Sequence, residues 1–175
     1  MKLEKGLVQV YTGNGKGKTS AAFGLVLRAV GRGLKICIVQ FIKGGFDYGE
    51  LYVIQRFPEV RLLAFGRGKF VSQKKPDNED VHLAEEGLKA AEDALATGEY
   101  DVVVLDEVNV ALNLNLIETQ KVLQLIRKKP IQTELVLTGR NAPKEIVAAA
   151  DLVTEMVEVK HPYNVGFKAR KGIEY

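Results

Sequence analysis

The sequence contains no tryptophan, one cysteine and only two histidines among its 175 residues. A single cysteine cannot form a disulfide within the chain, which is typical of a reducing compartment, so we expect a cytoplasmic protein. The scarcity of cysteine and histidine also argues against a zinc site. No apolar run is long enough to span a membrane, and the net charge of +3 is too small to indicate nucleic-acid binding. We therefore expect neither a membrane nor a nucleic acid as a partner.

Short apolar runs rich in β-branched residues alternate with helical patterns along the chain. Strands are predicted at residues 7–11, 35–41, 60–65, 102–105, 135–138 and 152–159. Helices are predicted at 19–32, at 79–96 with Asn78 as the cap, at 117–128, and from about residue 143. Most of the strand runs are continuously apolar, which predicts strands covered on both faces. This order predicts an α/β fold: one three-layer α/β/α domain over residues 1–175, with a mostly parallel sheet of about six strands.

The most informative motif lies between the first strand and the first helix. Residues 12–20 read Thr-Gly-Asn-Gly-Lys-Gly-Lys-Thr-Ser, and such a glycine-rich turn directs backbone N–H groups toward phosphate oxygens. Lys18 is predicted to reach the terminal phosphates and Thr19 to help hold Mg²⁺, while Lys16 adds a second cation. Thr12 occupies the place of the first glycine of the usual pattern. The motif predicts a nucleoside triphosphate ligand in a RecA-like P-loop NTPase fold.

A second element of the phosphate site follows the fourth predicted strand. Residues 101–107 read Asp-Val-Val-Val-Leu-Asp-Glu, which is typical of a buried strand with carboxylates at its carboxyl end. Asp106 is predicted to bind Mg²⁺ directly or through water, and Glu107 to position a reactant. Arg140, just after the fifth strand, is placed either to meet phosphate or ribose or to lie on the surface.

Three irregular segments follow strand ends: residues 42–49, residues 66–78 and the tail from Lys160 onward. Because ligands bind outside the carboxyl ends of parallel strands, all three segments are expected to reach the site. The tail carries His161, Asn164 and several cations, and its composition alone favours a solvated basic terminus.

Taken together, these motifs resemble the P-loop family of corrinoid adenosyltransferases, and the resemblance covers nearly the whole chain. It is carried by the glycine loop with Thr12, by Gln-Phe-Ile-Lys-Gly at residues 40–44, by Leu-Asp-Glu at 105–107, by Thr-Gly-Arg at 138–140, and by Lys-His-Pro at 160–162 with Lys-Gly-Ile-Glu-Tyr at 171–175. The resemblance implies transfer of the adenosyl group of ATP to the Co(I) centre of cob(I)alamin or a precursor, with release of triphosphate. It also implies Mg²⁺ or Mn²⁺, a homodimer and an electron-donating flavoprotein partner.

The same resemblance assigns roles to individual residues. It implies that Lys18 and Glu107 are catalytic and that Thr19, Asp106 and Glu107 hold the metal. In the family's third loop an aromatic lies beside the corrin, and here residues 66–71 read Gly-Arg-Gly-Lys-Phe-Val, with Phe70 as the aromatic. The residues implied to bind nucleotide or corrinoid are Thr12, Gly13, Asn14, Gly15, Lys16, Gly17, Lys18, Thr19, Ser20, Arg28, Gln40, Lys43, Phe70, Arg140, His161 and Asn164.

Two other functions fit the phosphate motifs. A RecA-like ATP-hydrolysing enzyme or kinase would use Glu107 to orient water or a hydroxyl at the γ-phosphate, and would release orthophosphate or a phosphorylated product. A non-catalytic, nucleotide-gated corrinoid carrier would bind both ligands without joining them. The reaction products distinguish the three functions.

Overall fold

The computed structural model describes residues 2–44, 48–67 and 77–175, and its core is one six-stranded sheet. All strand pairs are parallel, in the order β3-β2-β4-β5-β1-β6. The strands are β1 (Val8–Thr12), β2 (Ile36–Phe41), β3 (Val60–Phe65), β4 (Val102–Asp106), β5 (Glu134–Thr138) and β6 (Leu152–Glu155). The helices are α1 (Lys18–Val30), α2 (Gly49–Ile54), α3 (Asn78–Ala96), α4 (Val108–Asn113), α5 (Thr119–Lys128) and α6 (Lys144–Ala149), with a 3₁₀ turn η1 (Pro162–Val165). The predicted α/β fold is confirmed.

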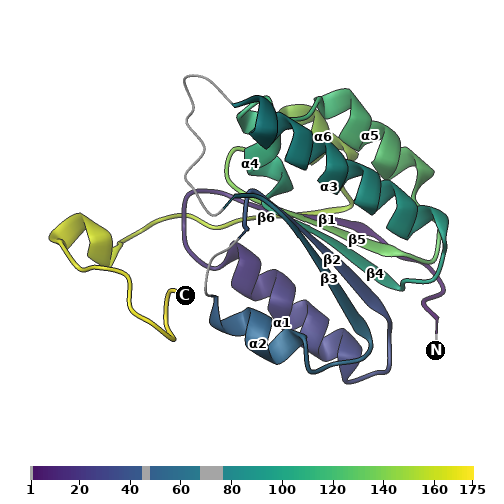
Figure 1. Cartoon of the computed structure of the whole chain (residues 1–175), viewed down its shortest axis with the longest axis horizontal. Coiled ribbons are helices and arrows are strands. Elements are labelled where there is room, and N and C mark those ends of the chain that lie inside the picture. The colour runs from purple at the N-terminus through teal and green to yellow at the C-terminus, as the bar shows by residue number, and fades with distance from the viewer. Residues whose placement is uncertain (1, 45–47, 68–76) are drawn as a thin grey trace.

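Helices cover both faces of the sheet, as Figure 1 shows. Helices α1 and α2 lie on one face, and α3, α4, α5 and α6 lie on the other. Alternate residues of the central strands divide between the two cores: Ile36 and Ile38 of β2 pack toward α1, whereas Cys37 and Val39 pack toward α3. Cys37, the cysteine of the chain, is fully buried. The central strands are apolar on both faces because both faces are covered.

Helix α1 forms because its apolar side chains recur on one stripe, with Ala22, Phe23, Val26 and Ala29 buried against the sheet. Helix α3 starts one residue earlier than predicted. Its cap is Asp77, whose side chain accepts a hydrogen bond from the Glu79 amide, so the expectation that Asn78 caps it was wrong. The short helices α2 and α4 were not predicted.

The sixth strand departs most from its prediction. It ends at Glu155 rather than at residue 159, and all four of its residues are exposed. The chain leaves the sheet at Met156 because its backbone turns to bond the glycine loop: the Met156 amide donates to the Thr12 carbonyl, and the Met156 carbonyl accepts from the Gly15 amide. From there the tail runs outward and returns, so that the C-terminus comes back toward the start of α1 (Figure 1). Within the described residues, no helix is both long and apolar enough to cross a membrane.

Candidate active site

The glycine loop between β1 and α1 is shaped by the chain that follows β6. The Gly15 amide donates to the Met156 carbonyl at 2.7 Å, and a Cβ atom on Gly15 would lie 2.7 Å from that same oxygen. Gly13 and Gly17 have φ angles of 92° and 116°, a region that residues with a side chain rarely adopt. Gly15 is therefore needed because the Met156 backbone lies so close to it, and Gly13 and Gly17 are needed because their φ angles are positive.

Thr12, in contrast, does not need to be glycine. It is the last residue of β1, pairs with Glu155 of β6, and has extended geometry suited to a β-branched side chain. Its hydroxyl accepts a hydrogen bond from the Ala142 amide at 3.2 Å. The substitution at the first position of the motif thus ties the loop to the chain after β5.

The two lysines of the loop point in different directions. Lys18 is 7% exposed and its ammonium donates to the Gly15 carbonyl at 2.6 Å, which folds it over the loop. Burial lowers the pKa of Lys18, and the nearby Arg140 guanidinium lowers it further. Lys16, predicted as a second cation of the phosphate cradle, instead donates to the Ile173 carbonyl at 3.1 Å and to the Glu174 carboxylate at 3.0 Å.

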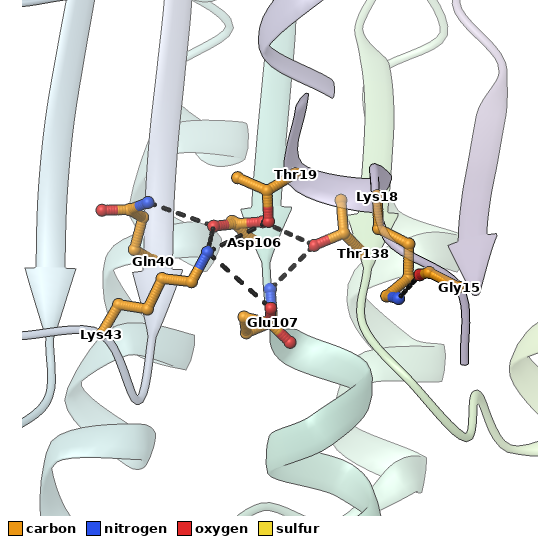
Figure 2. A network of polar contacts seen from close by, with 8 residues as sticks. All are labelled: Gly15, Lys18, Thr19, Gln40, Lys43, Asp106, Glu107 and Thr138. Atoms are coloured by element: carbon orange, nitrogen blue, oxygen red, sulfur yellow. Dashed lines mark hydrogen bonds and ion pairs between the residues drawn. The ribbon is translucent and has the colours of Figure 1, made fainter. Parts of the chain in front are cut away.

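Asp106, at the end of β4, is the centre of a polar network (Figure 2). Its side chain is fully buried, and each carboxylate oxygen accepts two hydrogen bonds. Oδ1 accepts from the hydroxyls of Thr19 at 2.9 Å and Thr138 at 2.6 Å. Oδ2 accepts from the Gln40 amide at 3.1 Å and the Lys43 ammonium at 2.9 Å. Three strands and the glycine-loop helix thus converge on one carboxylate, because β4 lies between β2 and β5.

Glu107 is turned into the site by its backbone. Its φ of 63° is in the left-handed region, and its amide donates to the Thr138 hydroxyl at 2.9 Å. The Glu107 carboxylate lies 3.7 Å from the Lys43 ammonium. Burial raises the pKa of Glu107 above its ordinary value, an effect that Lys43 opposes and Asp106 reinforces. Burial lowers the pKa of Lys43, but the carboxylates of Asp106 and Glu107 outweigh it and hold that pKa above its ordinary value.

A cavity of about 520 Å³ opens beside this network at the carboxyl ends of the strands. Its size is within the range of small-molecule binding sites. Four parts of the chain line it: the glycine loop, the segment after β2, the ends of β4 and β5, and the tail. The lining residues are Gly15, Lys16, Gly17, Lys18, Thr19, Ser20, Lys43, Tyr48, Gly49, Glu50, Glu107, Arg140, His161, Gly172, Ile173, Glu174 and Tyr175.

The remaining predicted site residues lie in different places. Gln40 is buried beneath the cavity on Asp106, and Asn164 lies in η1, where its side chain donates to Glu158. Arg28 is exposed in the last turn of α1, nine residues beyond Thr19 and therefore roughly 14 Å along the helix axis. Thr12, Gly13 and Asn14 belong to the loop but do not line the cavity. Phe70 falls outside the described residues, so its predicted contact with the corrin stays a prediction.

Sequence reasoning missed two groups of residues. Thr138 bonds both Asp106 and the Glu107 amide. Its signals in the sequence were its place at the carboxyl end of a strand and in the Thr-Gly-Arg stretch of the family resemblance, but no role was assigned to it. Glu174 joins Lys16 of the glycine loop to Arg170 of the tail, with contacts of 3.0 and 3.1 Å. The sequence predicts a tail that acts through its cations, but the tail contacts Lys16 of the loop through the Glu174 carboxylate and the Ile173 carbonyl.

The donor set around Asp106 fits a magnesium ion. Hydroxyl and carboxylate oxygens are the ligands that Mg²⁺ prefers, and it commonly takes its other ligands from phosphates and water. Thr19, Asp106 and Glu107 present such oxygens, and a cationic group, the Lys43 ammonium, already lies against all three. Within residues 2–44, 48–67 and 77–175 there is no cluster of three His, Cys, Asp or Glu side chains that could hold a metal by itself. Any such ion would depend on a phosphate ligand to complete its coordination.

An all-parallel sheet with a glycine-rich loop between its first strand and helix α1, and an acidic pair at the end of β4, defines the class of α/β proteins with a P-loop NTPase-like fold.

Within that class, the sequence profile of the family described as ATP:corrinoid adenosyltransferase BtuR/CobO/CobP matches residues 4–175, and the chain belongs to this family. A corrinoid adenosyltransferase of Pseudomonas aeruginosa is 44% identical over 98% of this chain and 85% of its own length. Corrinoid adenosyltransferases of Sinorhizobium and Escherichia coli K12 are 39% and 37% identical, each over 98% of this chain, and over 81% and 87% of their own lengths.

Proposed function

We propose that this chain, acting as one domain over residues 1–175, transfers the 5′-deoxyadenosyl group of ATP to the Co(I) centre of a corrinoid. The corrinoid is cob(I)alamin or a precursor. In this reaction cobalt attacks C5′ of the ribose, the C5′–O bond breaks, and triphosphate leaves with the bonding electrons. Membership of the adenosyltransferase family gives the reaction class. The observation that carries the proposal is the cavity in which the glycine loop, Glu107 and the tail face one another.

The glycine loop would hold the triphosphate and stabilise it as it departs. Negative charge accumulates on the leaving group, and preorganised amides and cations aimed at that charge lower the barrier. Lys18, whose ammonium donates to the Gly15 carbonyl, would release that carbonyl to reach a phosphate oxygen. Arg140 adds a second cation on the same cavity wall. As the family resemblance implies, we propose that the nucleotide lies with its ribose, and so C5′, toward the corrinoid.

Thr19, Asp106 and Glu107 would hold Mg²⁺ or Mn²⁺ beside the triphosphate. The ion, when bound, supplies further positive charge to the leaving group. Thr138 and Gln40 fix the orientation of Asp106, because each donates to a different carboxylate oxygen. Phe70 and the tail residues His161 and Asn164 are proposed to contact the corrinoid, as the family resemblance implies.

The proposal extends to the protein's assembly and location. We propose a homodimer, a cytoplasmic location and a flavoprotein that supplies the electrons for Co(I), all from the family resemblance. The homodimer is supported by strand β6, whose outer edge is unpaired among the described residues and exposes Leu152 and Val153, each 41% accessible. Sedimentation velocity of the purified chain tests it, and a monomer at micromolar concentration contradicts it.

The decisive experiment identifies both products. The protein is incubated in the dark with MgATP and chemically reduced cobalamin or cobinamide. A light-sensitive alkyl-corrinoid spectrum together with triphosphate, identified by ³¹P NMR, is the expected result. Orthophosphate release without a spectral change would instead indicate a hydrolase or kinase, and binding of both ligands without any product would indicate a carrier.

A further inference from the structure

The Lys43 ammonium lies where a divalent cation would be expected. Its Nζ atom is 3.0 Å from the Thr19 hydroxyl, 2.9 Å from Asp106 Oδ2 and 3.7 Å from Glu107 Oε1. Thr19 and Asp106 are assigned to the metal by the phosphate-site motifs, and Glu107 is assigned to it by the family resemblance. Figure 2 shows Lys43 reaching across from the end of β2 to this group, while Lys18 points away from it toward Gly15.

The backbone that carries Lys43 is held firmly. Ile42 has a φ of 68°, a conformation that is rare for a β-branched residue, and its amide donates to the Phe65 carbonyl at 2.7 Å. A Cβ atom on Gly44 would lie 1.9 Å from the Gly66 carbonyl oxygen, so the chain on the other side of Lys43 is also tightly packed. The backbone on both sides of Lys43 is therefore fixed, and this backbone places the Lys43 side chain over Asp106 and Glu107.

One ammonium and one divalent cation cannot use the same oxygens at the same time. Lys43 neutralises a buried carboxylate that has no exposure to water, and its side chain is only 15% exposed. The positive charge of the Lys43 ammonium repels a metal ion that approaches Asp106. The ammonium also occupies Asp106 Oδ2, which the metal ion would need as a ligand. A lysine ammonium on a flexible four-carbon stem can leave without any change in the backbone, provided that another anion receives it. Lys43 also lines the cavity, where a triphosphate would supply that anion.

We propose that Lys43 is a resident counter-cation that excludes divalent metal from the nucleotide-free protein and moves to the polyphosphate when the metal arrives with nucleotide. Metal binding is thereby coupled to nucleotide binding through one side chain. The inference rests on the proposed function only in taking a metal-chelated polyphosphate as the ligand.

The test measures metal binding without catalysis. Metal-stripped protein at pH 8 is titrated with Mn²⁺ alone, and free Mn²⁺ is followed by electron paramagnetic resonance. We expect Lys43→Met to bind Mn²⁺ at least tenfold more tightly than the wild type, and Lys43→Arg, which keeps the charge, to stay at the wild-type affinity. Lys35→Met is the matched control, because Lys35 pairs with Glu99 at the surface, 57% exposed, and should leave Mn²⁺ affinity unchanged. Adding Asp106→Asn to Lys43→Met should remove the gain, which locates the tightened site.

If Lys43→Met fails to fold because Asp106 is left without its counter-ion, Lys43→Gln keeps a hydrogen-bond donor at the same place and is expected to show the same gain. Equal Mn²⁺ affinity in the wild type and in the folded neutral variant overturns the inference. So does tight Mn²⁺ binding by the nucleotide-free wild type. Adenosyl transfer is measured separately, so a protein that makes no alkyl-corrinoid yet shows the predicted change in Mn²⁺ affinity refutes the proposed function and leaves this inference standing.

Discussion

Replacing Thr138 by valine tests whether the acidic pair depends on one buried hydroxyl. The substitution keeps the shape of the side chain but removes a donor to Asp106 Oδ1 at 2.6 Å and an acceptor for the Glu107 amide at 2.9 Å. A hydrogen bond to a charged group contributes about 1.5–3 kcal/mol, and leaving an amide without its partner costs about 1–3 kcal/mol. Burying an additional methyl group offsets about 0.8 kcal/mol.

The expected net loss of unfolding free energy is about 3 kcal/mol. For a chain of this size that lowers the melting temperature by about 9 °C. Thr133→Val is the matched control, because Thr133 precedes the same strand, is also buried, at 3% exposure against 0% for Thr138, and donates a single hydrogen bond to the Tyr100 carbonyl at 3.1 Å. Its loss should be about 1 kcal/mol, or about 3 °C.

Both variants are measured by thermal unfolding in the presence of a chelator and by the rate of alkyl-corrinoid formation. Thr138→Val should also lower kcat at least about tenfold, because the carboxylates that would face the metal and nucleotide lose the group that orients them. Thr133→Val should keep wild-type kcat. The reasoning is refuted if the two variants lose equal stability and Thr138→Val retains full activity.

Three further predictions concern the glycine loop and the tail. Lys18→Ala should lower kcat by about 10²–10³-fold, since it removes a cation that we propose to face the leaving group, and near-normal turnover would contradict this. Gly15→Ala should weaken ATP binding at least about tenfold, measured calorimetrically, because its Cβ would lie 2.7 Å from the Met156 carbonyl; Gly24→Ala in α1, with no atom within 4 Å, should instead raise the melting temperature by about 2 °C. Hydrogen bonds from Arg170 and, to a smaller extent, from Lys16 lower the pKa of Glu174 to about 2. The stability that the ionised Glu174 carboxylate contributes by holding the tail to the glycine loop is therefore complete above the ordinary pKa of 4.5 and is lost as the pH falls toward 2. An NMR titration midpoint near 4.5 for Glu174 would refute that contact, and Arg170→Met should raise the midpoint toward 4.5.

Local sequence was enough to predict the class of fold and the position of the glycine-rich loop between β1 and α1. Strand and helix periodicities depend on neighbouring residues, and five of the six predicted strands lie within one residue of their observed bounds. The errors fall where distant parts of the chain compete with local preference. Strand β6 stops early because Met156 bonds the glycine loop, and the cap of α3 moves to Asp77, whose side chain bonds the Glu79 amide and also pairs with Arg67 from the end of β3.

The sequence by itself determined where the glycine loop lies and which residues form it, because its glycines, Lys18 and Thr19 are adjacent along the chain. Only the tertiary structure decided which side chains meet there. Lys43 reaches Asp106 across 63 positions, and Lys16 meets Glu174 across 158. These contacts follow from the order of strands in the sheet and from the return of the tail. Residue periodicity carries no information about either, because it records which face of an element is buried and not which element lies beside it.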